Sequence, residues 1–222
     1  QFPERARRRG DYSNAEAITD QSLKAIKSRH QATERHLNQL LDIDRSALKE
    51  QDRISYDLFE FKLRREVDGH RFQTHLMPIG IRSGPHQRIP QMHKRVRFEK
   101  SADYENYITR LLQVPDLVEH VIERLRIGVS KGLTPPRIVI KGVPEQFESL
   151  LADDNISALR TPFEKMPKTI SDETKQDLRR RFDERAMPAV REALAELGEF
   201  VEDAYLPNCR SGIAASDLPD GE

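Results

Sequence analysis

Histidine is the residue type in this chain whose spacing comes nearest to making a metal site. Seven histidines occur, and four of them flank a proline-rich stretch: His70, His75, His86 and His93. A zinc site on a helix needs two histidines at positions i and i+4, because those side chains share one face. His70 and His75 are five apart and follow Gly69. The spacing therefore predicts surface or hydrogen-bonded histidines and no metal-ligand set in this chain.

The sequence does not indicate a nucleophilic site either. The one cysteine, Cys209, precedes Arg210, whose charge could lower the thiol pKa. No histidine lies in the same stretch to act as a base, so Cys209 is predicted to be a buried small residue. A single cysteine also excludes an internal disulfide. No catalytic residue is predicted.

The charge balance argues against nucleic acid as a partner. The chain has 37 Lys and Arg residues and 37 Asp and Glu residues, so its net charge is zero. Phosphate binding needs a basic excess on one face, often with stacking aromatic residues, and the chain has no tryptophan. The run Arg179-Arg180-Arg181 has Asp177, Asp183 and Glu184 within one turn, which favours ion pairs along a helix.

A long loop is a better candidate for a binding site. From His70 to Arg97 neither helical nor strand periodicity holds, because three prolines and two glycines interrupt both. Within it, the run from His86 and Gln87 to Pro90 places polar side chains on a restricted backbone, as a substrate cleft would require. A rigid packing loop is the alternative.

The rest of the chain is predicted to be helical, giving an all-α, multi-helix array around the long proline-rich loop. Asp20 or Ser22 can cap a first helix whose inward positions recur at spacings of three, four and seven: Leu23, Ile26, His30, Leu37, Leu40 and Leu41. A second helical pattern follows Ser46 and is weakened by Asp68-Gly69. The residues of this helix predicted to face inward are Ile54, Leu58, Phe61 and Val67. A short turn should make these two helices antiparallel.

After the loop, Ser101 is predicted to cap a short helix through about Gln113. Pro115 should start the next helix, and Gly132 can end it in a left-handed cap. Residues 137–140, with the sequence Arg-Ile-Val-Ile, fit either a helix or a buried strand.

A final long helix should run from Ser171 to about Tyr205 and bend at Pro188. The chain is therefore interpreted as one helical domain over residues 1–222. A possible subdivision separates residues 1–152 from 169–222, around a joint at 153–168.

The apolar content is low for a protein of this length. Hydrophobic residues make up 36% of the chain, which suits elongated helices or a part that packs against another part. No run of about 18 apolar residues is present, so no membrane span is predicted. No signal peptide is visible at the start, although a chain that begins at Gln1 without Met leaves earlier export open.

Several short motifs occur in the order found in one known family. They are Phe2-Pro3-Glu4, Thr19-Asp20-Gln21-Ser22, Leu76-Met77-Pro78, Ala102-Asp103-Tyr104-Glu105-Asn106-Tyr107, Thr134-Pro135-Pro136-Arg137 and Tyr205-Leu206-Pro207. Through them nearly the whole chain resembles the bacterial proteins grouped as domain of unknown function 885. Members carry a His-Glu-x-x-Pro-Gly-His zinc motif in a second helical half and look like gluzincin metallopeptidases. This chain has no such motif.

The resemblance implies that the chain is the N-terminal helical half of a zinc-dependent peptidase-like protein. It would form one wall of the substrate cleft and be inactive alone, while the missing C-terminal catalytic half would hold the zinc. Its partners would be that half and a short peptide, with His86, Gln87 and Arg137 as possible substrate contacts. An arginine at 137 could hold a peptide carboxylate with two hydrogen bonds.

The same resemblance favours a helix at residues 137–140 with a kink near Pro144, and suggests a periplasmic or lipoprotein location. A different class of function is also consistent with the sequence. A non-enzymatic helical binding or scaffold module would use an exposed apolar face to hold a partner.

Overall fold

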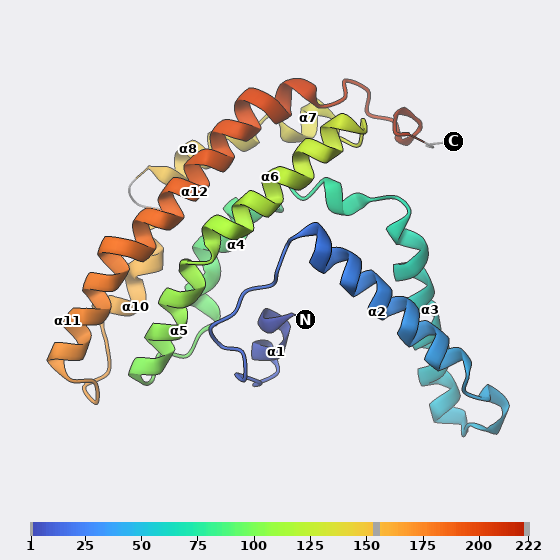
Figure 1. The fold of residues 1–222 in the computed structure, drawn as a ribbon, viewed down its shortest axis with the longest axis horizontal. Helices are drawn as coiled ribbons and strands as arrows, with labels where there is room; N and C mark the ends of the chain where they lie inside the picture. Colours follow the sequence, from blue (N-terminus) through green and yellow to red (C-terminus); the bar gives the residue numbers. More distant parts are fainter. Residues whose placement is uncertain (1, 153–155, 220–222) are drawn as a thin grey trace. The chain divides into compact units, whose positions relative to one another are not determined.

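The computed structural model describes residues 2–152 and 156–219, which form two compact units. The smaller unit spans Gln21–His75, and the larger one contains the residues before it and those from Leu76 onward. Every regular element in the described residues is a helix (Figure 1), so the all-α prediction is confirmed. The β-type pairings in that part of the chain are two isolated bridges, Gly80 with Ser83 and Pro136 with Arg210.

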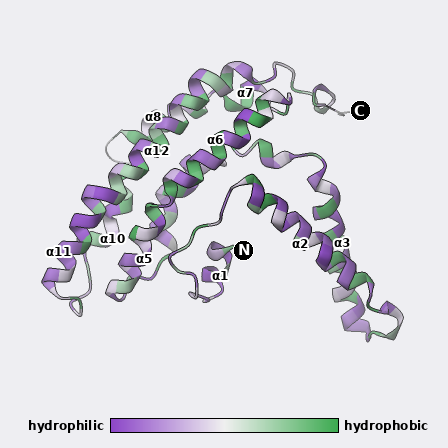
Figure 2. Ribbon diagram, viewed as in Figure 1, coloured by the Kyte–Doolittle hydropathy of each residue, from purple (hydrophilic) through white to green (hydrophobic). Residues whose placement is uncertain are grey.

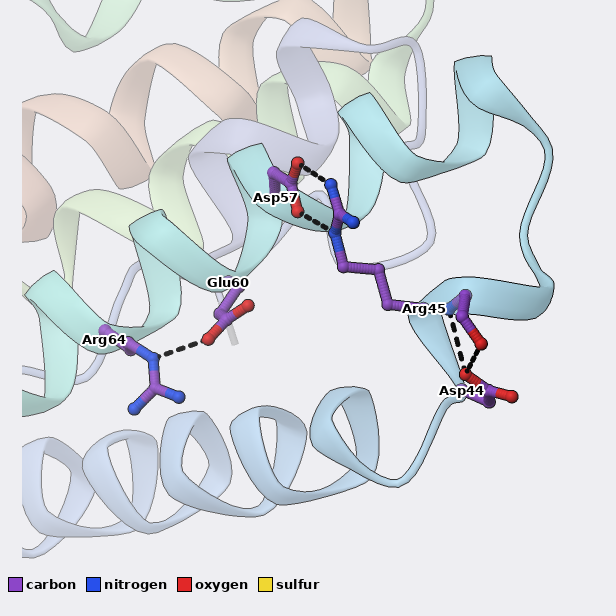
Figure 3. Close-up of polar contacts among 6 residues, drawn as sticks. Asp44, Arg45, Asp57, Glu60 and Arg64 are labelled. Carbon is purple, nitrogen blue, oxygen red and sulfur yellow. Dashed lines mark hydrogen bonds and ion pairs between the residues drawn. The ribbon is translucent and has the colours of Figure 1, made fainter.

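The smaller unit is a helical hairpin of α2 (Leu23–Leu41) and α3 (Glu50–His70), joined through the 3-10 helix Arg45–Ala47. Figure 1 shows the two long helices side by side, as the short connection predicted. Ser22 begins α2, because its hydroxyl accepts a hydrogen bond of 3.1 Å from the Ala25 amide. Arg45 attaches the connection to α3 through two hydrogen bonds to Asp57, of 2.6 and 2.7 Å (Figure 3).

The inward face of α3 differs from the sequence prediction. Tyr56 and Leu63 are buried against Leu37 and Leu40 of α2, with Val67 packed on the same cluster. The predicted inward residues Ile54, Leu58 and Phe61 are instead 50%, 66% and 62% exposed. The helix carries two apolar stripes on opposite faces, and periodicity alone does not say which of them meets α2. On α2, Leu41 was also predicted to face inward but is 42% exposed.

The larger unit contains the remaining helices. They are α1 (Pro3–Arg8), α4 (Pro85–Arg88), α5 (Ser101–Leu111), α6 (Val114–Ser130), α7 (Arg137–Ile140), α8 (Val143–Leu151), α10 (Thr161–Glu164), α11 (Asp172–Arg181) and α12 (Met187–Phe200). Short 3-10 helices lie at Ile89–Arg95, Ala158–Arg160, Leu206–Asn208 and Ala215–Asp217, and another, Thr74–Leu76, straddles the boundary between the units.

The ends of these helices follow local chemistry. Asp103 is the group that caps α5, because its carboxylate accepts the amides of Glu99 and Lys100 at 3.0 Å each; Ser101, which was predicted to cap, is already helical. Pro115 lies in the first turn of α6, as predicted. Gly132 has φ +68° just beyond α6, which confirms the left-handed cap.

The structure settles the ambiguous segment at residues 137–140 and shows where the long C-terminal helix is interrupted. Residues 137–140 form the single helical turn α7, and α8 is a separate helix after Gly142 with Pro144 in its first turn. The long C-terminal helix is interrupted by a π turn at Phe182–Ala186, next to Pro188. Because Pro188 has no amide hydrogen, the carbonyl one turn earlier loses its usual donor there. A second π turn follows α12 at Val201–Tyr205.

The core of the larger unit lies between α6, α8 and α12. Segments on both sides of residues 153–168 contribute to it, since Phe147 of α8 packs against Gly198 of α12. Residues 153–155 of the predicted joint lie outside the described residues, and the subdivision at that joint stays a prediction. Phe163, Tyr104 and Tyr107 extend the core as an aromatic cluster.

Gly198 provides a test of the contact between α8 and α12. A Cβ at this position would lie 3.0 Å from the Cβ of Phe147, whereas a Cβ at Gly69 of α3 would meet nothing within 4 Å. We expect Gly198→Val to lower the free energy of unfolding by about 1–3 kcal/mol. Gly69→Val should change it by less than about 0.5 kcal/mol. Urea unfolding followed by circular dichroism measures both, and equal effects would contradict the contact.

Candidate functional site

The loop before α4 is folded tightly against the larger unit. Gly80 and Ser83 exchange two backbone hydrogen bonds of 2.9 and 3.0 Å, which close a turn. Gly84 follows with φ +132°, a conformation that L side chains rarely adopt, and leads directly into Pro85 at the start of α4. His86 is thereby buried at 4% exposure, while Gln87 remains half-buried at the surface.

Gln146 of α8 holds this loop in place. Its amide nitrogen donates to the Ile81 carbonyl at 3.1 Å, which fixes the orientation of the amide. Its Oε1 then accepts hydrogen bonds from His86 Nε2 at 3.0 Å and from Gln87 Nε2 at 3.2 Å. We call His86, Gln87, Gln146 and the Ile81 carbonyl the amide cluster. The sequence predicted the loop but missed Gln146, which lies about 60 residues away and carries no local signal.

The amide cluster fixes the protonation of His86. Because Gln146 Oε1 can only accept, the hydrogen of the neutral ring is on Nε2 and the lone pair is on Nδ1. Burial lowers the pKa of His86, against a smaller opposite effect of the Gln146 hydrogen bond. Nδ1 is buried and has no partner in the described residues, and a Cβ on Gly84 would lie 3.0 Å from it. His86 is thus a neutral group that positions the loop.

Arg137 makes its contacts elsewhere in the larger unit. Its guanidinium Nη2 donates to the Pro207 carbonyl at 2.6 Å, and its backbone amide donates to the Arg210 carbonyl at 2.8 Å. The structure thus brings His86 and Gln87 together, while Arg137 fastens α7 to the C-terminal segment. Two-pronged binding of a carboxylate by Arg137 would require Nη2 to leave Pro207.

Cys209 belongs to the same C-terminal segment, between Pro207 and Arg210. It is 3% exposed, and burial raises the pKa of its thiol to about 11, although the nearby charge of Arg137 acts in the opposite direction. The neighbouring Arg210 side chain is bound to backbone carbonyls, including those of Thr134 and Gly212. The thiol is therefore protonated near neutral pH and unsuited to nucleophilic attack.

The smaller unit holds a second polar feature, a stack of three imidazoles. The rings of His30 and His70 lie 3.7 Å apart with an interplanar angle of 12°, and His75 follows at 5.4 Å from His70. Glu34 lies 3.3 Å from His30 Nε2. The stack borders a surface groove of about 460 Å³, whose lining also includes Leu23, Ile26, Lys27 and Gln31. Sequence reasoning missed it, because His30 and His70 meet only when α2 pairs with α3.

The stack does not have the geometry of a metal site. The His30 and His70 rings are nearly parallel, so the lone pairs of their nitrogen atoms lie in two separate, parallel planes. A metal ion needs lone pairs that point toward one position. Throughout residues 2–152 and 156–219, no group of three or more His, Cys, Asp or Glu side chains is arranged to hold a metal ion.

Arg110 of α5 is a buried cation that the sequence pattern did not mark. It is 2% exposed, with its guanidinium 5.6 Å from the centre of the Tyr107 ring. Its Nε and Nη2 atoms are buried without a hydrogen-bond partner in the described residues. Burial lowers the pKa of Arg110 to about 10, so the guanidinium stays charged at neutral pH.

The sequence of the chain matches one family model. The model describes a bacterial protein of unknown function, DUF885, and the match covers residues 3–222. No curated protein matches the chain. Within the described residues, no helix has both the length and the apolar character needed to cross a membrane.

The imidazole stack predicts a pH dependence of stability. Burial and the neighbouring His30 lower the pKa of His70 below its ordinary 6.5, so the unfolded chain binds this proton more readily than the folded one. The contribution of neutral His70 to the free energy of unfolding is therefore complete above about pH 7. It is lost as the pH falls below 6.5 toward the pKa of His70 in the folded state. We expect urea unfolding at pH 7.5 and pH 5.5 to show this loss.

Comparison with variants assigns the effect to the stack. His70→Gln should reduce the difference between the two pH values, whereas His36→Gln, at an exposed position of α2 outside the stack, should leave it unchanged. The other groups that face the stack are His75, Glu34 and Lys27. An unaltered difference in His70→Gln would contradict the assignment.

Arg110 predicts a substitution that stabilises the protein. A buried guanidinium whose Nε and Nη2 atoms lack hydrogen-bond partners in the described residues carries a desolvation cost. Arg110→Met should therefore raise the free energy of unfolding by about 1–3 kcal/mol, while its side chain fills most of the same space. Arg110→Lys keeps the charge and should give no gain. A loss of stability in Arg110→Met would mean that the guanidinium is paired in solution, with Glu4 as the nearby carboxylate.

Proposed function

Because this chain belongs to the DUF885 family of bacterial proteins of unknown function, we propose that it supplies a substrate-binding wall of a zinc-dependent, peptidase-like protein. The amide cluster is the observation that carries the proposal. Gln146 fixes a loop whose half-buried Gln87 and exposed Ile81 are held at the surface. Gln87 Nε2 donates to the Ile81 carbonyl and to Gln146, so its Oε1 is the atom that would accept a hydrogen bond from a peptide N–H. The apolar Ile81 suits a side chain of the peptide.

In this proposal the part played by the described residues is peptide binding. His86, neutral and closed off by Gly84, would position the loop without touching the substrate. Gln87 is the proposed contact, with exposed Arg82 and Arg88 on either side of it. Zinc chemistry would depend on residues of the remaining part of the protein, and a periplasmic or lipid-anchored location belongs to the same proposal.

The protein expressed from the intact gene tests this proposal. We expect about one zinc ion per chain by elemental analysis and hydrolysis of short peptides, whereas residues 1–222 alone should bind no stoichiometric zinc and hydrolyse nothing. Gln146→Leu in the intact protein should lower kcat/KM about 3- to 10-fold through KM, because it releases the loop that carries Gln87. Gln39→Leu, on the exposed surface of α2, is the matched control.

A helical binding or scaffold module is the second candidate function. The exposed apolar stripe on α3 favours it, since Leu58 and Phe61 are each more than half exposed. An intact gene product that contains no zinc and cleaves no peptide would support the module and refute the peptidase-like role.

A further inference from the structure

The outer face of α3 carries an apolar stripe in the smaller unit. Ile54, Leu58 and Phe61 are 50%, 66% and 62% exposed. At about 100° per residue they fall within about 60° of arc, on the side of the helix opposite the buried Tyr56 and Leu63. Figure 2 shows hydrophobic positions interspersed with hydrophilic ones along α3.

Two exposed charges of opposite sign lie in line with this stripe, one at each end. Glu50 is in the first turn of α3, and Arg65 lies one turn beyond Phe61, with its guanidinium 5.5 Å from the centre of the Phe61 ring. Neither Glu50 nor Arg65 forms an ion pair within the described part of the chain.

Two carboxylates that flank the stripe, Asp57 and Glu60, are already paired within the hairpin. Asp57 accepts two hydrogen bonds from Arg45, and Glu60 accepts one of 2.7 Å from Arg64 (Figure 3). Glu50 and Arg65 are then the charges next to the apolar residues on the line of the stripe, while exposed Asp68 lies one turn beyond Arg65 and Lys62 lies at the edge of the stripe.

We propose that two copies of this chain associate through α3, packed antiparallel about a two-fold axis close to Leu58. In this register Ile54 of one copy faces Phe61 of the other, and Glu50 faces Arg65, so each contact occurs twice. A parallel arrangement would instead place Glu50 against Glu50 and Arg65 against Arg65. Because Glu50 and Arg65 lie at opposite ends of the stripe, their charges favour a second copy of α3, packed antiparallel, as the partner that binds to the stripe.

The size of the stripe sets the strength of this association. A single helical face of three large apolar side chains is smaller than the about 800 Å² per partner of a standard interface. The dimer is therefore weak, and it forms in the micromolar range or above. The inference is independent of the peptidase-like role, because it depends only on residues of α3.

Sedimentation equilibrium of the 222-residue chain tests the proposal. We expect the average mass to rise from monomer to dimer between about 1 µM and 1 mM. Phe61→Glu should weaken dimerisation at least about 100-fold, since it places a charge at both symmetric contacts. Phe72→Glu is the matched control, because Phe72 is 56% exposed but lies outside the stripe, and it should leave the dissociation constant unchanged.

Charge reversal tests the antiparallel register itself. Glu50→Arg and Arg65→Glu should each weaken dimerisation at least about fivefold, because each turns two attractive pairs into repulsive ones. The double variant restores opposite charges across the axis and should regain most of the lost affinity. Circular dichroism of each variant establishes that α3 remains folded.

Any one of the following results would overturn the proposal. The first is a chain that stays monomeric at 1 mM. The second is a dimer that Phe61→Glu does not weaken, and the third is a double charge variant no better than either single one. Binding of monomeric chains to phospholipid vesicles, lost in Phe61→Glu, would assign the stripe to a lipid surface and also refute the second copy as its occupant.

Discussion

Packing between α6 and α12 is the interaction on which the larger unit depends. Val118, Val121 and Leu125 of α6 are at most 2% exposed, and Val190 and Leu194 of α12 are fully buried in the same core. With hydrophobic residues at 36% of the chain, few other surfaces can bury so much apolar area. The α8 helix, and with it Gln146 and the amide cluster, is held in position by packing on α12. The geometry of the loop is therefore a consequence of this core.

The larger unit also buries polar atoms that have no hydrogen-bond partner in the described residues. Arg110 Nε and Nη2, His86 Nδ1 and the Tyr205 hydroxyl are buried without partners in the described residues. Each such group costs free energy, because it has left water without gaining a hydrogen bond. Burial also raises the pKa of Tyr205, so its hydroxyl keeps its proton. Of these groups, His86 supports a surface feature, since its other ring nitrogen holds the loop to Gln146.

The sequence was informative wherever structure is set by neighbours along the chain. Ser22, Pro115 and Gly132 mark helix ends through their own hydrogen bonds or backbone angles, and the structure places them at those ends. The outer face of α3 was misassigned because Leu58 and Phe61 are as periodic as Tyr56 and Leu63. Only the pairing with α2 distinguishes the two stripes, and that pairing is a tertiary property.

The same distinction applies to the candidate site. His86 and Gln87 were found from the restricted backbone around them, and their closeness is a local fact. Gln146 and the contact between His30 and His70 come from segments distant in sequence, so no motif announces them. Arg137 was identified by resemblance as a substrate contact, and its Nη2 is bound to Pro207. Whether any of these residues meets a substrate remains a prediction.

The two π turns of the C-terminal helix have a consequence for tolerance to deletions. Leu178, Phe182, Ala186 and Val190 are buried at successive steps of four, a spacing that drifts around a regular α-helix. The wide turn at Phe182–Ala186 cancels part of this drift and keeps the series on one side. A wide turn of this kind holds one residue more than a regular α-helix would, so loss of a single residue there would restore regular turns. Leu178 and Val190 would then be separated by about 1,100° of rotation and would stay within about 20° of the same face. The same loss within the regular helix α12 would rotate the residues after it by about 100° and carry some of them toward water. Related chains should therefore differ in length by one residue at the wide turn more readily than within α12.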